Sequence, residues 1–445
     1  VELYDTKDKK VVWSDRWQEK WDNLPTIKGS LSDGLLKALD TKPKVEQKID
    51  TTNPEAYEFY LKAKHKYEKR ENTDDTEIVR GLLKKAIELD DNLILAKLLI
   101  GRTYTEMGDY DEAMEIYTAA LKQAEELGDK RGMGQSLYSI GAVHYYKGDY
   151  DRALGYFSRA LAIKEELGDK LGMGQSLNNI GILHANKGDL DTALDYYGRA
   201  LGIQEELADK SGMGLSLNSI GIVHYNKGDQ DKALDYCARS LTIQEELGDK
   251  LGMGYSLNNI GAVHANKGDY DRALDCYGRS LTIKEELGDK RGMGQSLYNI
   301  GAVHADKGDY DRALDCYGRL LTIKEELGDK AGIGTSLSNI GIVHKDKGDY
   351  DKALDYCVKS LAIQEELGDK LGMGQALGNI GLVHHNRGEY NRVVEYLEKS
   401  LSIQKEIGFK GLELFTTTYL YLSYKHLGKD YDEQDIHSLV KDADN

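Results

Sequence analysis

Residues typical of a buried helix face recur along this chain in pairs of stripes. If Gly134 is counted as position 1 of the segment 134–173, the first stripe occupies positions 4, 7, 8 and 11, and the second occupies positions 20, 24, 27 and 28. Spacings of three and four residues predict two amphipathic helices. Between them, Lys147-Gly148-Asp149 combines a cation suited to a helix C-terminus, a glycine for the left-handed position and an N-cap aspartate. The segment therefore predicts a helical hairpin.

The hairpin pattern repeats with a period of 40 residues. The marker glycines are Gly128, Gly168, Gly248, Gly288, Gly328, Gly368 and Gly408, and Ala208 is the single substitution. A fixed period of this length indicates stacked copies of one supersecondary unit. We expect an all-α chain in which near-identical hairpins form a solenoid.

The small and large residues of the hairpin have a familiar order. Position 8 is Gly, position 20 Ala, position 24 mostly aromatic, and position 27 mostly Ala or Ser. This pattern resembles the tetratricopeptide repeat over about residues 53–428, although Leu replaces the usual Trp at position 4 and the usual Pro at position 32 is absent. The second helix runs on through Lys164–Leu167, as in the similar 40-residue repeats of kinesin light chains and Leu-Gly-Asn adaptor proteins. The resemblance implies a right-handed α-solenoid with a concave groove.

Four parts are expected along the chain. The segment Val1–Trp13 reads as two short strands joined by Asp5–Lys10, and Leu24–Leu39 as a helix. The run 11–39 resembles the end of the TolB-like amino-terminal domain found beside such repeats in bacterial kinases, cyclases and transcription regulators, which implies a missing upstream half. The expected division is 1–52, a partial TolB-like α/β segment and linker; 53–93, a degenerate helical hairpin; 94–413, eight repeats; and 414–445, a capping hairpin with an acidic tail.

Charge narrows the range of partners. The net charge is −17, and the first 50 residues are balanced, so the excess lies in the repeats. An acidic body repels phosphate backbones, which argues against nucleic acid. No apolar run is long enough to span a membrane. The chain opens at Val1 without a signal peptide. We expect a cytoplasmic protein, or one of the cell envelope if a targeting segment precedes it.

Two columns of reactive residue types are expected to be structural. Cys237, Cys276, Cys316 and Cys357 lie about one repeat apart, too far for disulfides, which favours free buried thiols in a reducing compartment. A histidine stands at position 11 of seven repeats, from His144 to His384. Neighbouring members lie about 10 Å apart and cannot share a metal ion, so we expect each to pack in the core and bond a backbone group.

No sequence pattern for catalysis emerges. The repeated Gly-Met-Gly element lacks the Lys-Ser/Thr of a phosphate loop, and instead suits close packing at the start of the first helix. The chain has no zinc spacing and no catalytic triad or dyad. The prediction is a protein that is not an enzyme and has no cofactor, metal or catalytic residues.

Primary amides mark the opposite side of the first helix. They stand at positions 2, 6 and 13, which face away from the hairpin core. The candidate peptide-binding residues are Asn179, Asn259, Asn299, Asn339, Asn379, Gln175, Gln295, Gln375, Asn186 and Asn266. An amide donates and accepts, so such a column matches the backbone of an extended peptide. Asparagine ladders hold peptides in kinesin light chains, and the resemblance implies the same role. Alternatively, repeat duplication has copied a neutral, solvated asparagine.

These features predict a protein- or peptide-binding scaffold that holds an extended segment in its groove. The resemblance implies the sensor or adaptor part of a bacterial signalling or regulatory protein. The alternative is a structural protein in which near-identical repeats stack between chains, so self-association is possible.

Overall fold

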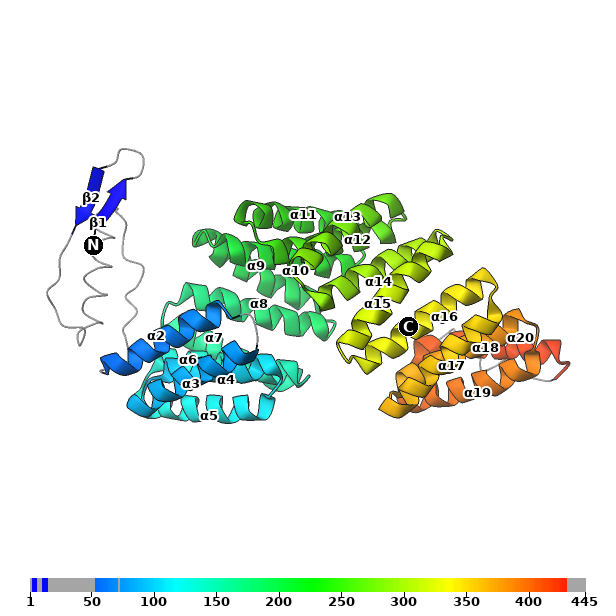
Figure 1. The fold of residues 1–445 in the computed structure, drawn as a ribbon, viewed down its shortest axis with the longest axis horizontal. Helices are drawn as coiled ribbons and strands as arrows, with labels where there is room; N and C mark the ends of the chain where they lie inside the picture. The colour runs from blue at the N-terminus through cyan, green and yellow to red at the C-terminus, as the bar shows by residue number, and fades with distance from the viewer. Residues whose placement is uncertain (1, 6–9, 15–52, 71–72, 430–445) are drawn as a thin grey trace. The chain divides into compact units, whose positions relative to one another are not determined.

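The computed structural model describes residues 2–5, 10–14, 53–70 and 73–429. The chain divides into two compact units, Val1–Gly212 and Met213–Asn445. In each unit, the described residues from 53 onward form helices that follow one another in tandem (Figure 1). Within each unit, these tandem helical hairpins are the all-α repeat fold that the sequence predicts.

The N-terminal hairpin is present. Strand β1 (Glu2–Asp5) pairs antiparallel with β2 (Lys10–Ser14), and Leu3 lies opposite Trp13. The two strands differ from the predicted ones by one residue at their ends. The expected helix 24–39, with most of the TolB-like run, and the acidic tail 430–445 lie outside the described residues.

Helices of similar length alternate along the chain. In the first unit they are α2 (Pro54–Glu68), α3 (Thr73–Leu89), α4 (Ile94–Met107), α5 (Tyr110–Leu127), α6 (Lys130–Tyr146), α7 (Tyr150–Glu166), α8 (Lys170–Asn186) and α9 (Leu190–Glu206). The second unit begins inside α10 (Lys210–Asn226) and continues with α11 (Gln230–Leu247), α12 (Lys250–Asn266), α13 (Tyr270–Glu286), α14 (Lys290–Asp306), α15 (Tyr310–Glu326), α16 (Lys330–Lys347), α17 (Tyr350–Leu367), α18 (Lys370–Asn386), α19 (Tyr390–Ile407) and α20 (Lys410–His426). Even-numbered helices from α4 onward are the first helices of the repeats, and odd-numbered ones are the second helices.

The helix ends follow the capping chemistry expected from sequence. Asp149 accepts a hydrogen bond from the backbone N–H of Arg152 at the start of α7, and Asp169 does the same for Gly172 in α8. Gly148 has a φ of 78°, in the left-handed region. Ala208 is the one described non-glycine residue with positive φ, at 51°.

Small residues let the two helices of a hairpin touch. Leu137, Ile140, Ala153 and Phe157 are buried between α6 and α7. A Cβ added to Gly141 would lie 2.9 Å from a ring carbon of Phe157. The glycine at position 8 is therefore required by the large residue at position 24, and the same fit recurs along the array.

Consecutive repeats are joined by periodic ion pairs at the helix ends. Lys267 Nζ, just after α12, lies 2.8 Å from Asp231 in α11 and so links neighbouring repeats, whereas Lys250 Nζ in α12 lies 2.8 Å from Glu286 in α13, within one hairpin. Equivalent pairs recur every 40 residues. Because these groups are exposed, each pair contributes at most about 1 kcal/mol.

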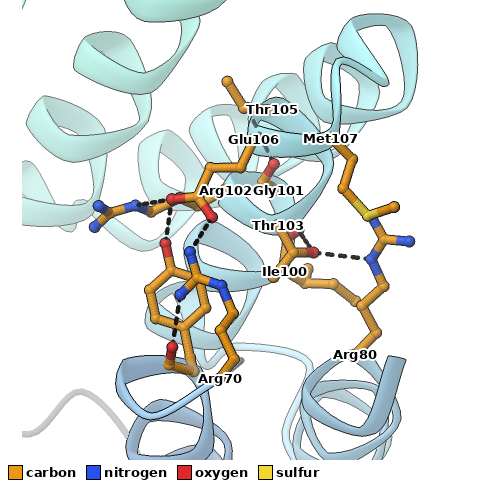
Figure 2. A network of polar contacts seen from close by, with 10 residues as sticks. Arg70, Arg80, Ile100, Gly101, Arg102, Thr103, Thr105, Glu106 and Met107 are labelled. Atoms are coloured by element: carbon orange, nitrogen blue, oxygen red, sulfur yellow. Dashed lines mark hydrogen bonds and ion pairs between the residues drawn. The ribbon is translucent and has the colours of Figure 1, made fainter. Parts of the chain in front are cut away.

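The degenerate hairpin α2–α3 is fastened to α4 by a buried arginine and a shared carboxylate (Figure 2). Arg80 donates to Thr103 Oγ1 at 3.0 Å, and its guanidinium stacks 3.7 Å from the ring of Tyr104. Glu106 accepts from Tyr67 at 2.5 Å and from Arg70 at 2.6 Å. These contacts make the hairpin part of the packed array rather than a linker.

Candidate functional site

A pocket opens in the second unit between successive first helices. Its walls come from α16, α18 and α20, and its floor comes from α17 and α19; these helices are shown in yellow to red in Figure 1. Its volume is about 270 Å³. Three predicted site residues line it, namely Asn339, Gln375 and Asn379. No charged side chain is among its lining residues.

The amides at position 6 join neighbouring repeats. In four of the five predicted cases, Nδ2 donates to the side chain at position 5 of the preceding repeat: Asn179 to Tyr138 at 2.8 Å, Asn259 to Asn218 at 3.0 Å, Asn299 to Asn258 at 3.1 Å and Asn379 to Ser338 at 3.0 Å. All are partly buried. They are therefore structural links as well as surface groups, which the sequence did not predict.

Asn339 departs from this pattern. Its Nδ2 is buried and has no hydrogen-bond partner. The preceding position 5 is Tyr298, whose side chain is 40% exposed. An unpaired donor at the wall of a pocket remains available to a ligand.

The other predicted amides lie at the surface. Gln175, Gln295 and Gln375 are exposed near the start of α8, α14 and α18, and Asn186 and Asn266 are exposed at the ends of α8 and α12. Gln295 Nε2 donates to Asn299 Oδ1 at 3.3 Å. We call the surface of the second unit that carries Asn259, Asn266, Gln295, Asn299, Asn339, Gln375 and Asn379 the amide face. Asn339, Gln375 and Asn379 are brought together in the pocket between α16, α18 and α20.

The pocket floor contains polar residues that the sequence analysis missed. They stand at position 31 of the second helices, where the residues are Lys164, Gln204, Gln244, Lys284, Lys324, Gln364 and Gln404. Gln364 and Gln404 are 4% and 2% exposed. Position 31 continues the buried stripe of positions 20, 24, 27 and 28. A polar residue at a position expected to be buried was the sequence feature that could have identified this column.

The Gly-Met-Gly element makes room for this column. A Cβ on Gly372 would lie 2.5 Å from Cδ of Gln364. Close packing at the start of the first helix, predicted from sequence, is confirmed. The neighbouring serines are satisfied: Ser360 Oγ donates to the carbonyl of Gly334 at 2.8 Å, and Ser400 Oγ to that of Gly374 at 2.7 Å.

Lysines in the same column carry buried charge. Lys164 Nζ donates hydrogen bonds to two neutral groups, Ser176 Oγ at 3.0 Å and the Gly172 carbonyl at 3.2 Å. Burial lowers the pKa of Lys164 to about 8, partly offset by Asp169. Lys324, in contrast, pairs with Asp329 at 2.7 Å.

The histidine column is packed. The Nδ1 atom of each ring faces the carboxylate five residues later, from 2.6 Å for His384 to 3.7 Å for His224 and His304. Nδ1 thus faces an acidic side chain, and the expected backbone partner stays a prediction for Nε2. Five rings stack on the tyrosine at position 23, as in His144 on Tyr156. Burial lowers the pKa of His144, His224 and His304.

The cysteines match their prediction. All four are free and buried. Burial raises the pKa of Cys237 and Cys357 to about 12, which leaves both as inert thiols. Over the described ranges, no group of three or more His, Cys, Asp or Glu is placed to hold a metal ion. None of the described helices is long and apolar enough to cross a membrane.

The family profile of the tetratricopeptide repeat matches the array four times. The matches cover residues 93–166, 172–247, 252–326 and 332–406, more than half of the chain. The chain belongs to the tetratricopeptide repeat family. Each match spans two of the helical hairpins described above. A comparison with curated proteins finds no match.

Solved structures share the fold at low sequence identity. A signal transduction ATPase with numerous domains and a tetratricopeptide repeat sensor, from Pyrococcus horikoshii, has a TM-score of 0.62 and 14% identity over 86% of this chain and 57% of its own. The apo quorum sensor NprR from B. thuringiensis has a TM-score of 0.56 and 14% identity over 79% of this chain and 97% of its own. A Rap protein complexed with Competence and Sporulation Factor has a TM-score of 0.54 and 14% identity over 79% of this chain and 99% of its own.

Proposed function

We propose that this protein is a peptide- or protein-binding scaffold that holds an extended segment against the amide face, as the sensor or adaptor part of a bacterial signalling protein. The observation that carries the proposal is the uncharged pocket in which Asn339, Gln375 and Asn379 meet. Groups that both donate and accept suit the alternating N–H and C=O groups of a peptide backbone.

The comparisons support a binding role. A Rap protein of the same fold is described in complex with Competence and Sporulation Factor, and NprR is described as a quorum sensor. Both are similar to this chain over most of their own length. From these similarities we propose that this chain is a regulatory domain that binds a peptide.

The chemistry of the pocket favours binding over catalysis. Its lining offers amides, hydroxyls and apolar groups, but no acid, base or thiol. A general acid or base needs a titratable group within hydrogen-bond reach of the substrate. We therefore propose a scaffold rather than an enzyme. Its buried thiols suit a reducing compartment such as the cytoplasm.

Affinity capture tests the proposal. The full chain is immobilised, incubated with lysate of the source cell and washed with salt, and retained proteins are identified by mass spectrometry. The test variant combines Asn266→Ala, Gln295→Ala and Gln375→Ala, all exposed. The matched control combines Thr242→Ala, Thr282→Ala and Thr322→Ala, exposed on second helices.

We expect both triple variants to keep their melting temperature, because exposed substitutions usually change stability by less than about 0.5 kcal/mol. Affinity for the retained partner should fall at least tenfold in the test variant only. Equal affinity in both variants would show that the amide face does not bind. Growth of particle size with concentration, in light scattering of the chain alone, would favour the self-assembling alternative.

A further inference from the structure

The pocket between α16, α18 and α20 contains polar atoms with no partner. Gln364 Oε1 and Gln404 Oε1 are buried acceptors without a hydrogen bond, and Asn339 Nδ2 is a buried donor without one. All three residues line the same cavity. Gln244 Oε1, at the same position of an earlier repeat, is also buried and unpaired but does not line this cavity. What distinguishes the cavity is that residues with two unpaired acceptors and one unpaired donor line it together, and buried amide atoms are normally paired.

The unpaired atoms define the chemistry of that complement. Two carbonyl oxygens require N–H donors, and one amide N–H requires an acceptor. A carboxylate has no donor, and an ammonium group has no acceptor. Either charge would also enter a pocket whose lining is uncharged, at a large desolvation cost. A primary carboxamide supplies N–H donors and a carbonyl acceptor without charge.

One lining residue of the pocket is a glycine where the preceding repeats have a larger residue. Position 5 of the repeats is Tyr138, Asn178, Asn218, Asn258, Tyr298 and Ser338, but in α18 it is Gly378. Gly378 lines the pocket, and a Cβ there would lie 3.6 Å from Ser400 Oγ, an ordinary contact. A larger residue would fit the backbone and occupy the opening.

The depth of the floor determines what can reach it. Gln364 and Gln404 belong to the second helices and are 4% and 2% exposed, so they lie behind the surface of the first helices. A peptide backbone lying across the amide face would not reach them, whereas a side chain would. Ile342, Leu412 and Phe415 offer apolar walls for its methylene groups.

We infer that this pocket takes the carboxamide side chain of a glutamine or asparagine in a bound peptide. The inference rests on the proposed function and adds a sequence preference to it. Peptide selection separates the two. The probe is a library of randomised 12-residue peptides displayed on phage and selected on the immobilised full chain.

We expect the selected peptides to share Gln or Asn at one position. In a synthetic peptide from the selection, replacing that residue by Glu or Leu should lower affinity at least tenfold. The variant Gly378→Asn, which restores an asparagine at position 5, should lose this preference. Gly198→Asn is the matched control, because Gly198 is exposed on α9 and a Cβ there meets nothing within 4 Å.

A second variant guards against a folding artefact. Gln364→Met removes the acceptor while keeping most of the volume, and should reduce the Gln-over-Leu preference at least fivefold with an unchanged melt. Selected peptides without an amide preference, or a preference that survives Gly378→Asn, would overturn the inference and leave the proposed function standing. Full competition by free L-glutamine would assign the pocket to a small molecule instead. Failure to select any peptide would overturn both.

Discussion

At the residue scale, the same amide type has two roles on the first helices. Asn299 donates to the preceding repeat, whereas Asn339 at the equivalent position has an unpaired Nδ2. The difference arises from the partner at position 5, Asn258 in one case and Tyr298 in the other. The asparagines at position 6 therefore differ in role: the residue at position 5 of the preceding repeat decides whether the amide is hydrogen-bonded or remains unpaired.

This difference is measurable as stability. Asn299→Ala removes a partly buried hydrogen bond and leaves Asn258 Oδ1 without that donor, so we expect a loss of about 1 kcal/mol in the free energy of unfolding. Asn339→Ala, with the same change in helix propensity, should cost close to nothing. Urea denaturation of both variants checks this, and equal losses would contradict the assigned links.

The buried lysine at position 31 gives a pH-dependent prediction. The folded pKa of Lys164 is about 8, below the unfolded value of about 10.4, so the unfolded chain binds the extra proton between these values. Stability of the parent should therefore rise with pH across that window. Lys164→Gln, the residue present at Gln204, should stabilise the protein by roughly 1–3 kcal/mol at pH 7. The gain should vanish above about pH 10.5.

Lys324→Gln is the control for this effect. Its ammonium is paired with Asp329, so the same substitution removes a favourable contact and should give no gain at pH 7. Denaturant unfolding at pH 7, 9 and 10.5 compares the two. A gain of similar size in both variants would contradict the role of unpaired charge.

At the element scale, helix termination depends on the left-handed residue that follows the second helix. Glycine occupies that position after most second helices, and Ala208 adopts a φ of 51° after α9. An alanine in this region is strained, because its Cβ lies too close to the backbone. The C-terminus of α9 is thus the least stable among the ends of the second helices of the repeats, which otherwise have glycine at this position.

Replacing Ala208 by glycine should relieve that strain. We expect Ala208→Gly to raise the free energy of unfolding by about 1 kcal/mol, since the strain removed exceeds the added entropy of the unfolded chain. The reciprocal change, Gly248→Ala at a φ of 66°, should lower it by a similar amount. Thermal melts of both variants check the sign, and a stabilising Gly248→Ala would count against it.

At the scale of the whole molecule, stability should be close to a sum over repeats and their interfaces. Most links between neighbours recur at the same positions. If residues 254–293 were removed, Asn299 would meet Asn218 in place of Asn258, and Lys307 would meet Asp231 in place of Asp271. The new junction would thus contain the same pairs of residue types as the junctions of the parent.

Deletion of residues 254–293 should therefore give a folded protein. We expect helical circular dichroism per residue close to that of the parent and a smaller denaturant m-value, because less surface is exposed on unfolding. The pocket lined by residues 335–416 should keep its peptide preference. As a control, deletion of 254–283 breaks the 40-residue period and should not fold. An insoluble 254–293 deletion would show that long-range contacts close the array.

The hairpin, its caps and its period can be predicted from the sequence alone. Leu137 and Phe157 lie on faces set by helical spacing, and Asp149 and Gly148 act within a few residues of themselves. Such features depend on local geometry, which every repeat carries in its own 40 residues. The free, buried cysteines follow from the same spacing.

The contacts between polar groups of different repeats depend on tertiary packing and could not be predicted from the sequence. Asn299 and Asn258 are 41 residues apart, and their contact depends on how one hairpin is offset against the next. Gln364 and Gln404 come from second helices, yet they line one pocket together with Asn339 and Gly378 from first helices. A pattern within one repeat cannot contain these contacts, because hydrogen bonds need distances near 3 Å between groups placed by two separate packing interfaces.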